Sequence, residues 1–282
     1  MDPNNSIPRR HILRVLPHRG YATKLPIWLL CSVLIMLIAF WNIAYNETLT
    51  NIFSKISKGW GITLAVSVFA YIASVTLGLI MALLRISAFR VLREFATLYI
   101  ELIRGIPMLV LLYYIAFVGA PGLVWLLNAI TQPLQSLGLM DPINIRSISF
   151  TSRAIISLTI GYSAFIAEIF RAGIESIDDG QYEAALALGF SRSNVLYRVV
   201  LPQAIRNVLP PLGNELVAII KDSALVSAVG VADLTLNTRL YTASTFRFFE
   251  SYSILALLYL ILTISLTLGV RKLESYLKSH KL

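Results

Sequence analysis

The chain has 282 residues, of which 57% are hydrophobic and 14% are charged, and its mean hydropathy is +0.73. A soluble domain carries about 25% charged residues, so this composition excludes an ordinary soluble protein and indicates a polytopic membrane protein. The net charge of +9 would favour a nucleic-acid partner in a soluble chain, but in a membrane protein it reflects basic cytoplasmic segments. The single cysteine, Cys31, excludes an internal disulfide, and all three histidines lie in the terminal tails.

Six apolar runs predict six transmembrane helices, because about 20 apolar residues span the hydrocarbon core of a bilayer. They cover residues 26–45, 59–84, 94–118, 150–170, 209–231 and 251–270. The third is interrupted by Glu101, Arg104 and Pro107, and Pro210-Pro211 is expected to mark where the fifth enters the membrane. The first run exceeds a signal-peptide core, which has about 7–15 residues, so an uncleaved helix is expected. Polar connections are expected at 46–58 and 232–250, and an interfacial helix around Trp125 within 119–147. The predicted fold class is therefore an all-α polytopic membrane protein.

Basic residues indicate how the spans are oriented. With both termini in the cytoplasm, sixteen Lys and Arg residues fall in inside segments and six in outside segments. Cytoplasmic loops carry an excess of Lys and Arg, so this orientation is favoured, and it requires an even number of spans. The segment 172–206, between the fourth and fifth spans, then lies in the cytoplasm.

That cytoplasmic segment predicts a short exposed helix. Asp179 can cap a helix that begins near Gly180, and Glu183 then lies in the first turn, where a carboxylate suits the helix dipole. Ala184 and Ala185 leave a flat surface that another protein can approach closely. Gly189 can supply the left-handed residue that ends the helix.

A second short helix is expected directly afterwards. Ser191 can cap it, and Pro202 is expected to end or bend it, because proline lacks the backbone N–H that continues a helix. The alternative is an ordinary polar loop with one helical turn. The combination of Glu183-Ala-Ala, Gly189 and Leu201-Pro202 resembles the EAA loop of ABC-importer permeases.

Three further stretches resemble the polar amino acid branch of these permeases. They are YIELIRGIP at 99–107, with Ile106 in place of the usual Thr, AEIFRAG at 167–173, and LPPLGN at 209–214 followed by KDSALVS at 221–227. The resemblance covers about residues 59–275. It implies the type I ABC-importer transmembrane fold, with a five-helix core at 59–275, an extra first helix within 1–58, and a cytoplasmic tail at 276–282.

The resemblance also implies partners. Two permease chains, identical or paralogous, form a dimer in the bacterial inner membrane, two ATPase subunits bind beneath it, and an extracytoplasmic binding protein delivers an amino acid. The loop Glu183–Gly189 would dock on the ATPase. The sequence contains no G-x-x-x-x-G-K-[ST], so ATP and Mg would be held by the partner, and the chain is expected to be a transport subunit without bound cofactor or metal.

Charged residues inside spans are costly and are expected to have partners. Glu101 and Arg104 are three residues apart, as are Glu168 and Arg171, so each pair shares a helix face. We predict two structural ion pairs at these positions.

The fifth predicted span carries a larger polar set. Asn214 and Lys221 are seven residues apart and share a face, as do Glu215 and Asp222, and Ser223 follows. These side chains are expected to line a pathway and to contact the charged groups of an amino acid. Alternatively, the two charges at 221 and 222 could pair across the dimer or with loops near the ATPase.

Two other functions compete with an importer subunit. An ion-coupled carrier or channel would explain the charges in the spans, but it leaves the helical loop at Glu183 unexplained, and the sequence has no inverted repeat. An intramembrane protease would need a base beside its nucleophile or an H-E-x-x-H zinc motif, and the sequence offers neither within a span.

Overall fold

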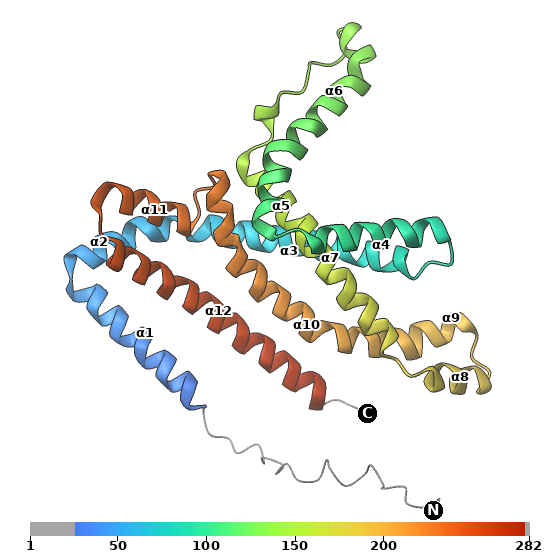
Figure 1. The fold of residues 1–282 in the computed structure, drawn as a ribbon. Helices are drawn as coiled ribbons and strands as arrows, with labels where there is room; N and C mark the ends of the chain where they lie inside the picture. The colour runs from blue at the N-terminus through green and yellow to red at the C-terminus, as the bar shows by residue number, and fades with distance from the viewer. Residues whose placement is uncertain (1–25, 280–282) are drawn as a thin grey trace, which may run out of the picture. The chain divides into compact units, whose positions relative to one another are not determined.

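The structure is a computed structural model that describes residues 26–279; the basic N-terminal tail and the three histidines lie outside this range. The described chain is helical and contains no strand (Figure 1). The α-helices are α1 (Ile27–Tyr45), α2 (Glu47–Ile56), α3 (Trp60–Arg85), α4 (Arg90–Gly105), α5 (Met108–Tyr114), α6 (Ala120–Ser136), α7 (Phe150–Glu175), α8 (Asp179–Ala187), α9 (Arg192–Val195), α10 (Leu201–Asp222), α11 (Leu234–Thr245) and α12 (Phe248–Ser279). Residues Met1–Asn42 and Ile43–Leu282 form two separate units.

Helix α1 supplies most of the described part of the first unit. It is apolar around its whole circumference, and nearly all of its side chains are exposed. The hydroxyl of Ser32 and the amide of Asn42 each donate to a carbonyl four residues earlier, which satisfies these polar groups within the helix. An apolar helix of this length suits a lipid environment.

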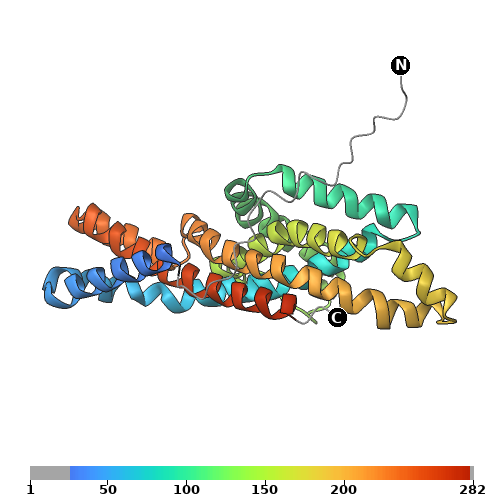
Figure 2. The same ribbon diagram turned by 90° about the horizontal axis from the view of Figure 1, so that it is seen from below.

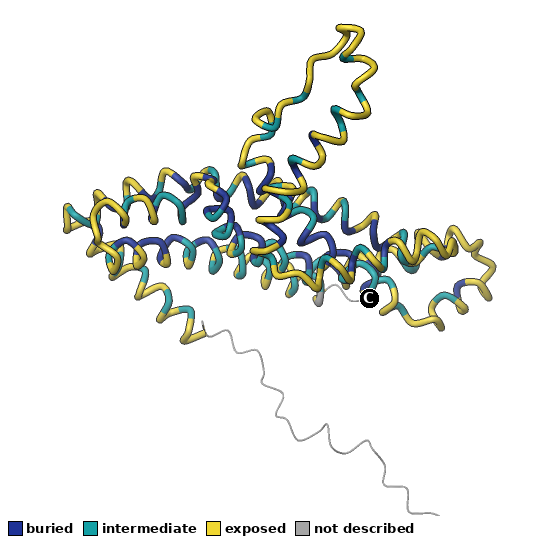
Figure 3. The backbone as a smooth tube through the Cα atoms, turned by 45° about the horizontal axis from the view of Figure 1, so that its top comes forward, coloured by how far each residue is buried: buried dark blue, intermediate teal, exposed yellow. Residues whose placement is uncertain are grey.

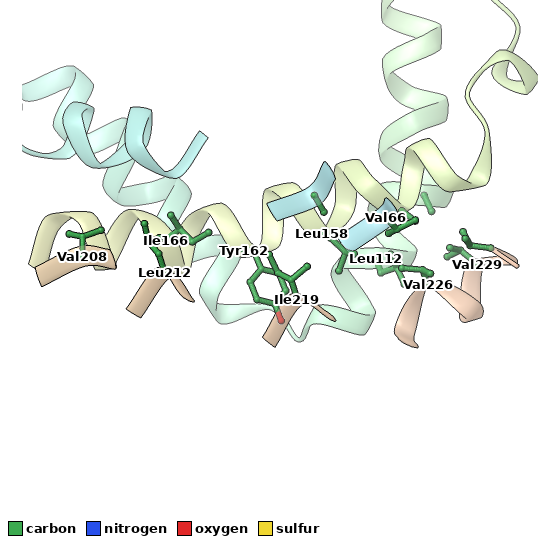
Figure 4. Close-up of a cluster of buried hydrophobic side chains, with 14 residues drawn as sticks. Val66, Leu112, Leu158, Tyr162, Ile166, Val208, Leu212, Ile219, Val226 and Val229 are labelled. Carbon is green, nitrogen blue, oxygen red and sulfur yellow. The ribbon is translucent and has the colours of Figure 1, made fainter. Parts of the chain in front are cut away.

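The second unit is built around α3 and α7, which pack along each other, with α10 and α12 beside them (Figure 2). A buried cluster joins α3, α7 and α10, and Val66, Tyr162, Ile166, Leu212 and Ile219 belong to it (Figure 4). A Cβ atom on Gly78 of α3 would lie 2.7 Å from Cγ2 of Ile166, so a glycine is needed where the two helices meet. Burial is concentrated in this bundle, whereas α6 and the segment after it are largely exposed (Figure 3).

Within residues 26–279, five helical runs are long and apolar enough to cross a membrane by length and composition. They are Ile27–Tyr45, Glu47–Arg85, Met108–Ser136, Phe150–Glu175 and Phe248–Leu277. The predicted first, second, fourth and sixth spans fall within four of them. The predicted fifth span corresponds to the end of α10 and the 3₁₀ helix Ser223–Val229, which carry more polar residues.

The predicted third span, 94–118, is wrong as a single helix. Helix α4 ends at Gly105, and α5 begins at Met108. Between them Ile106 is extended, with φ −101° and ψ 129°, because a residue before proline is disfavoured in the α conformation. After this break the chain runs through α5, a π-helical turn at Ile115–Gly119 and α6, and α6 lies crosswise to α3 in Figure 1. An interfacial position for α6 stays a prediction.

Both polar connections predicted at 46–58 and 232–250 contain a helix. Asn46 caps α2 by accepting from the N–H groups of Thr48 and Leu49, and α2 buries Ile52 and Ile56 completely. Asp233 caps α11 through the N–H of Leu236. The period of α2 is present in the sequence, since Leu49, Ile52, Phe53 and Ile56 recur at i, i+3, i+4 and i+7. It was missed because ten residues are too few for a span and the segment was predicted as a polar connection, whereas α11 has no such clear period.

Candidate coupling and transport sites

Helix α8 is capped by Asp178, not by Asp179 as predicted. The Asp178 residue is extended, and its carboxylate accepts from the N–H of Gly180 at 2.7 Å. Asp179 instead occupies the first turn of the helix. Two adjacent aspartates are both good caps, and the backbone of the preceding turn decides which one is used.

The other end of α8 closes as the sequence suggested. Gly189 has φ +86°, its N–H donates to the Leu186 carbonyl at 2.9 Å, and the N–H of Phe190 donates to the Ala185 carbonyl at 3.2 Å. These two bonds define a Schellman motif, which satisfies the last carbonyls of the helix. Helix α8 is therefore a short element with a defined start and end.

The outer surface of α8 combines a carboxylate with apolar side chains. Glu183 and Ala184 are exposed, while Ala185 is buried at 6% exposure. Leu188 is 79% exposed, and Leu186 and Phe190 are partly exposed. Exposed apolar groups around one acid suit a protein partner with an apolar groove and a basic side chain.

The segment after α8 is one continuous helical run, which corrects the predicted end at Pro202. Ser191 caps it by accepting from the N–H of Asn194, and α9 passes through a π-helical turn, Leu196–Val200, into α10. In that turn the N–H of Leu201 donates to the Leu196 carbonyl, five residues earlier. The wider turn lets Pro202 enter the first turn of α10, where its missing N–H does no harm. Pro210 and Pro211 lie inside α10 and do not mark its start.

An ion-pair network joins three helices at the end of the bundle that carries α8. Arg171 donates to Glu168 and to Glu175 on its own helix. Arg85, at the end of α3, donates to Glu168 at 2.7 Å and lies 3.8 Å from Glu101 of α4. The sequence suggested the pair of Glu168 with Arg171, but Arg85 was missed because it is 83 residues from Glu168.

The predicted pairing of Glu101 with Arg104 is not the contact in the structure. The guanidinium carbon of Arg104 lies 5.7 Å from the centre of the Phe165 ring, as in a cation–π contact. Glu101 is 62% exposed and faces Arg85. The i, i+3 spacing allowed a pair, but each side chain has a partner on another helix.

The polar residues of α10 and the turn after it divide into two groups. Asn214 and Lys221 are exposed, whereas Glu215 and Asp222 are half-buried. Ser223 is fully buried, and its hydroxyl donates to the Ile220 carbonyl at 2.8 Å, so its side chain is committed to the helix end.

Two tyrosines from α3 and α7 complete the half-buried group. Tyr162 donates its hydroxyl to Asp222 at 2.8 Å, and Tyr71 donates to the Leu212 carbonyl at 3.1 Å. Neither Glu215 nor Asp222 forms an ion pair with another described side chain. Sequence spacing identified the acids on α10, but it gave no signal for the tyrosines that face them.

A second buried polar group lies at the opposite end of α3. Asp233 is fully buried; it caps α11 and lies 3.5 Å from the Tyr259 hydroxyl. Burial raises the pKa of the Asp233 carboxyl. The next residue, Leu234, donates its N–H to Thr63 of α3 at 3.2 Å. This cluster fastens α11 to α3 and α12, and sequence reasoning missed it.

Comparison with known proteins places these features in context. The family model described as "Binding-protein-dependent transport system inner membrane component" matches residues 74–278. The probable glutamine ABC transporter permease protein GlnM of Bacillus subtilis (strain 168) is 38% identical over 226 residues, which are 80% of this chain and 94% of the relative. The arginine transport system permease protein ArtQ of the same organism is 33% identical over 239 residues, covering 85% and 99% of the two chains.

Solved structures agree with these relatives. The crystal structure of an amino acid ABC transporter with histidines shares 35% identity and a TM-score of 0.66, covering 80% of this chain and 94% of that one. An inward-facing MetNI methionine ABC transporter is 19% identical, with a TM-score of 0.57 and coverage of 82% and 99%. The second similarity supports the fold alone.

Proposed function

This chain belongs to the family of inner membrane components of binding-protein-dependent transport systems, and we propose that it forms one half of the pathway through which an ATP-driven importer moves polar or charged amino acids. Its fold is that of the type I ABC-importer permeases, as the sequence predicted. The observation that carries the proposal is α8, a doubly capped, exposed helix between two spans, in a chain similar to glutamine and arginine permeases.

The energy for transport comes from a separate subunit. The relatives are permease subunits, and this sequence has no phosphate-binding loop of its own. We propose that two ATPase subunits, which hold ATP and Mg, bind beneath a pair of permeases in the bacterial inner membrane. An extracytoplasmic binding protein would deliver the amino acid, and both termini would lie in the cytoplasm.

Coupling would proceed from α8 into the bundle. Closure of the ATPase pair displaces α8 through the exposed surface at Glu183 and Ala184. Ala185 is buried and holds α8 against the rest of the chain, and Gly189 fixes the end of the helix. Helix α7 leads directly into α8, and the pair of Arg85 with Glu168 ties α7 to α3, while Arg171 holds Glu168 within α7. A movement of α8 would therefore reach α3 and α7 together.

The substrate would meet the polar residues of α10. Asn214 and Lys221 are exposed and can contact the carboxylate of an amino acid, while Glu215 and Asp222 can contact an ammonium group. Tyr162 holds the Asp222 carboxylate in place through its hydroxyl. Ser223 would act on this site through the end of α10, because its hydroxyl is already bonded to Ile220.

Charge reversal at Glu183 tests the proposal. We expect Glu183→Lys to weaken association with the ATPase, or to uncouple ATP hydrolysis from transport, on the order of tenfold or more, because it places like charges in the contact. Co-purification from detergent-solubilised membranes measures association, and substrate uptake against ATP hydrolysis measures coupling. Asp141→Lys, at an exposed position in the loop after α6, is the control and should keep wild-type association with the ATPase and wild-type coupling. Wild-type coupling in the Glu183 variant would contradict docking through α8.

A further inference from the structure

A pocket of about 520 Å³ opens where the end of α3, the start of α4 and the end of α7 meet. The polar part of its lining consists of Arg85, Arg93, Thr97, Arg171 and Glu175. Three guanidinium groups thus line a space that contains one carboxylate. Glu168, which binds two of these arginines, is not part of the lining.

The three arginines differ in what they already bind. Arg85 and Arg171 are held by Glu168, so their guanidinium groups are fixed in position. An arginine has five N–H donors, and each of these two keeps donors beyond its ion pairs. Arg93 is exposed and has no ion pair with another described side chain. The pocket therefore has two oriented cations and a third whose charge is unmatched.

The apolar rim of the pocket consists of Ile86, where α3 turns into α4, and Ile174 of α7, and both line the pocket. Phe89 and Val91 follow Ile86 in the chain and are exposed, but they do not line the pocket. Ile86 is 44% exposed, Phe89 is 73% exposed and Val91 is 81% exposed. Exposed apolar side chains beside arginines are typical of the boundary between hydrocarbon and water. The same end of the bundle carries α8, on the cytoplasmic side by the distribution of basic residues (Figures 1 and 2).

We propose that this pocket binds the phosphate of an anionic phospholipid from the cytoplasmic leaflet, with Arg93 as the side chain that decides whether the lipid is retained. The phosphate would receive N–H donors from Arg93 and from the fixed arginines, and the acyl chains would lie against the apolar rim. Basic pockets between transmembrane helices on the cytoplasmic side suit such headgroups. The bound lipid would join α4 to α7 beside the coupling helix.

A lipid fits this pocket better than an acidic segment of a partner protein. An acidic peptide would pair with the arginines but would make no use of the apolar rim formed by Ile86 and Ile174. A lipid uses both the charge and the apolar rim. Helix α8, in contrast, presents a carboxylate beside apolar side chains, so its charge is negative where the charge of the pocket is positive.

Arg90 supplies a matched control for Arg93. Both are exposed arginines in the first turn of α4, and only Arg93 lines the pocket. We would purify the assembled complex with wild-type chain, Arg93→Gln or Arg90→Gln, and titrate each with phosphatidylglycerol and with phosphatidylcholine under native mass spectrometry. We expect one phosphatidylglycerol per chain in the wild type, binding roughly five- to tenfold weaker in Arg93→Gln, and wild-type binding in Arg90→Gln.

Several results would overturn the proposal. Equally weakened phosphatidylglycerol binding in both variants would mean that the lipid is attracted by the general surface charge and not by the pocket. Binding of phosphatidylcholine as tight as that of phosphatidylglycerol would mean that the anionic headgroup is not recognised. Displacement of the lipid by millimolar inorganic phosphate would identify a site for free anions. Loss of the ATPase subunit from Arg93→Gln alone would identify the pocket as a protein contact. None of these readouts depends on which substrate is transported.

Discussion

Gly189 is the residue on which the end of α8 depends. Its φ of +86° lies in the left-handed region, where a side chain is unfavourable, and the Schellman bonds around it exist only in that conformation. Space is not the constraint, because a Cβ atom at this position would meet nothing within 4 Å. The requirement for glycine comes from the backbone alone.

Gly189→Val should therefore loosen α8 without disturbing the bundle. The left-handed conformation costs a residue with a side chain about 1–2 kcal/mol, and hydrogen exchange of the α8 amides should quicken roughly 5- to 30-fold. Binding to the ATPase should weaken in parallel. Gly61→Val is the control, because Gly61 is equally open but lies in α3 with a negative φ. Similar exchange from α8 in both variants would show that the turn is not under this constraint.

The network around Glu168 acts at the scale of elements, since it holds α3 and α7 together as one block and reaches α4 only through Glu101. Its contacts are unequal. Arg85 and Glu168 have side chains only 20% and 26% exposed, and they lie 2.7 Å apart. Arg85 and Glu101 lie 3.8 Å apart, with Glu101 62% exposed, so solvent screens that contact. The first contact should hold the block together, and the second should contribute little.

A pair of substitutions separates the two contacts. Arg85→Gln removes a partly buried charge partner and should lower the free energy of unfolding by about 1–2 kcal/mol, and we expect weaker coupling between ATP hydrolysis and uptake. Glu101→Gln should change the free energy of unfolding by less than about 0.5 kcal/mol. Thermal unfolding of the purified complex measures both. A loss in Glu101→Gln as large as that in Arg85→Gln would mean that α4 is held by charge more than by packing.

For the whole molecule, the sequence predicted best those helices that contain a long apolar run. Twenty apolar residues in a row can be recognised without a structure, so α1, α3, α7 and α12 were anticipated. Short helices were missed because a search for runs of about 20 apolar residues passes over them. Helix α2 carries Leu49, Ile52, Phe53 and Ile56 at helical spacing, but it has only ten residues. Pro107 was visible, but the sequence did not show that the chain would break there and then continue as a second long run.

The candidate sites could likewise be predicted where their residues lie close together in the sequence, and not where the residues come from different helices. Spacing along one helix found Glu168 with Arg171, and the capping residues around Gly189. It could not find Arg85 with Glu168, or Tyr162 with Asp222, because these partners are 83 and 60 residues apart and meet only through helix packing. The i, i+3 rule also suggested a Glu101–Arg104 pair, and contacts with other helices prevailed over local spacing.

The first unit is expected to be dispensable for coupling. The family match begins at residue 74, and Ile43–Leu282 is compact by itself. A chain beginning at Ile43 behind a cleavable signal peptide, which would place the new N-terminus outside, should still co-purify with its ATPase and support uptake within about twofold of wild type. The control is the full chain without a signal peptide, because its first helix would already place residue 46 outside. Failure of the shortened chain alone to assemble would assign α1 a structural role in the complex.

The π-helical turn at Leu196–Val200 has a consequence for length variation in this chain. Such a turn holds one more residue than an α-helical turn. The side chains before and after it therefore point in the same directions as in a regular α-helix that is one residue shorter. Deletion of a single residue within 196–200, combined with Pro202→Ala, should therefore turn the run from α9 to α10 into a regular helix whose α10 side chains still face their present neighbours. The second change is needed because a proline inside a regular helix clashes with the carbonyl four residues earlier. Elsewhere in α10, the same deletion would rotate everything beyond it by about 100°. This turn is thus the one place along this helical run where the chain can lose a residue and keep both of its ends in register.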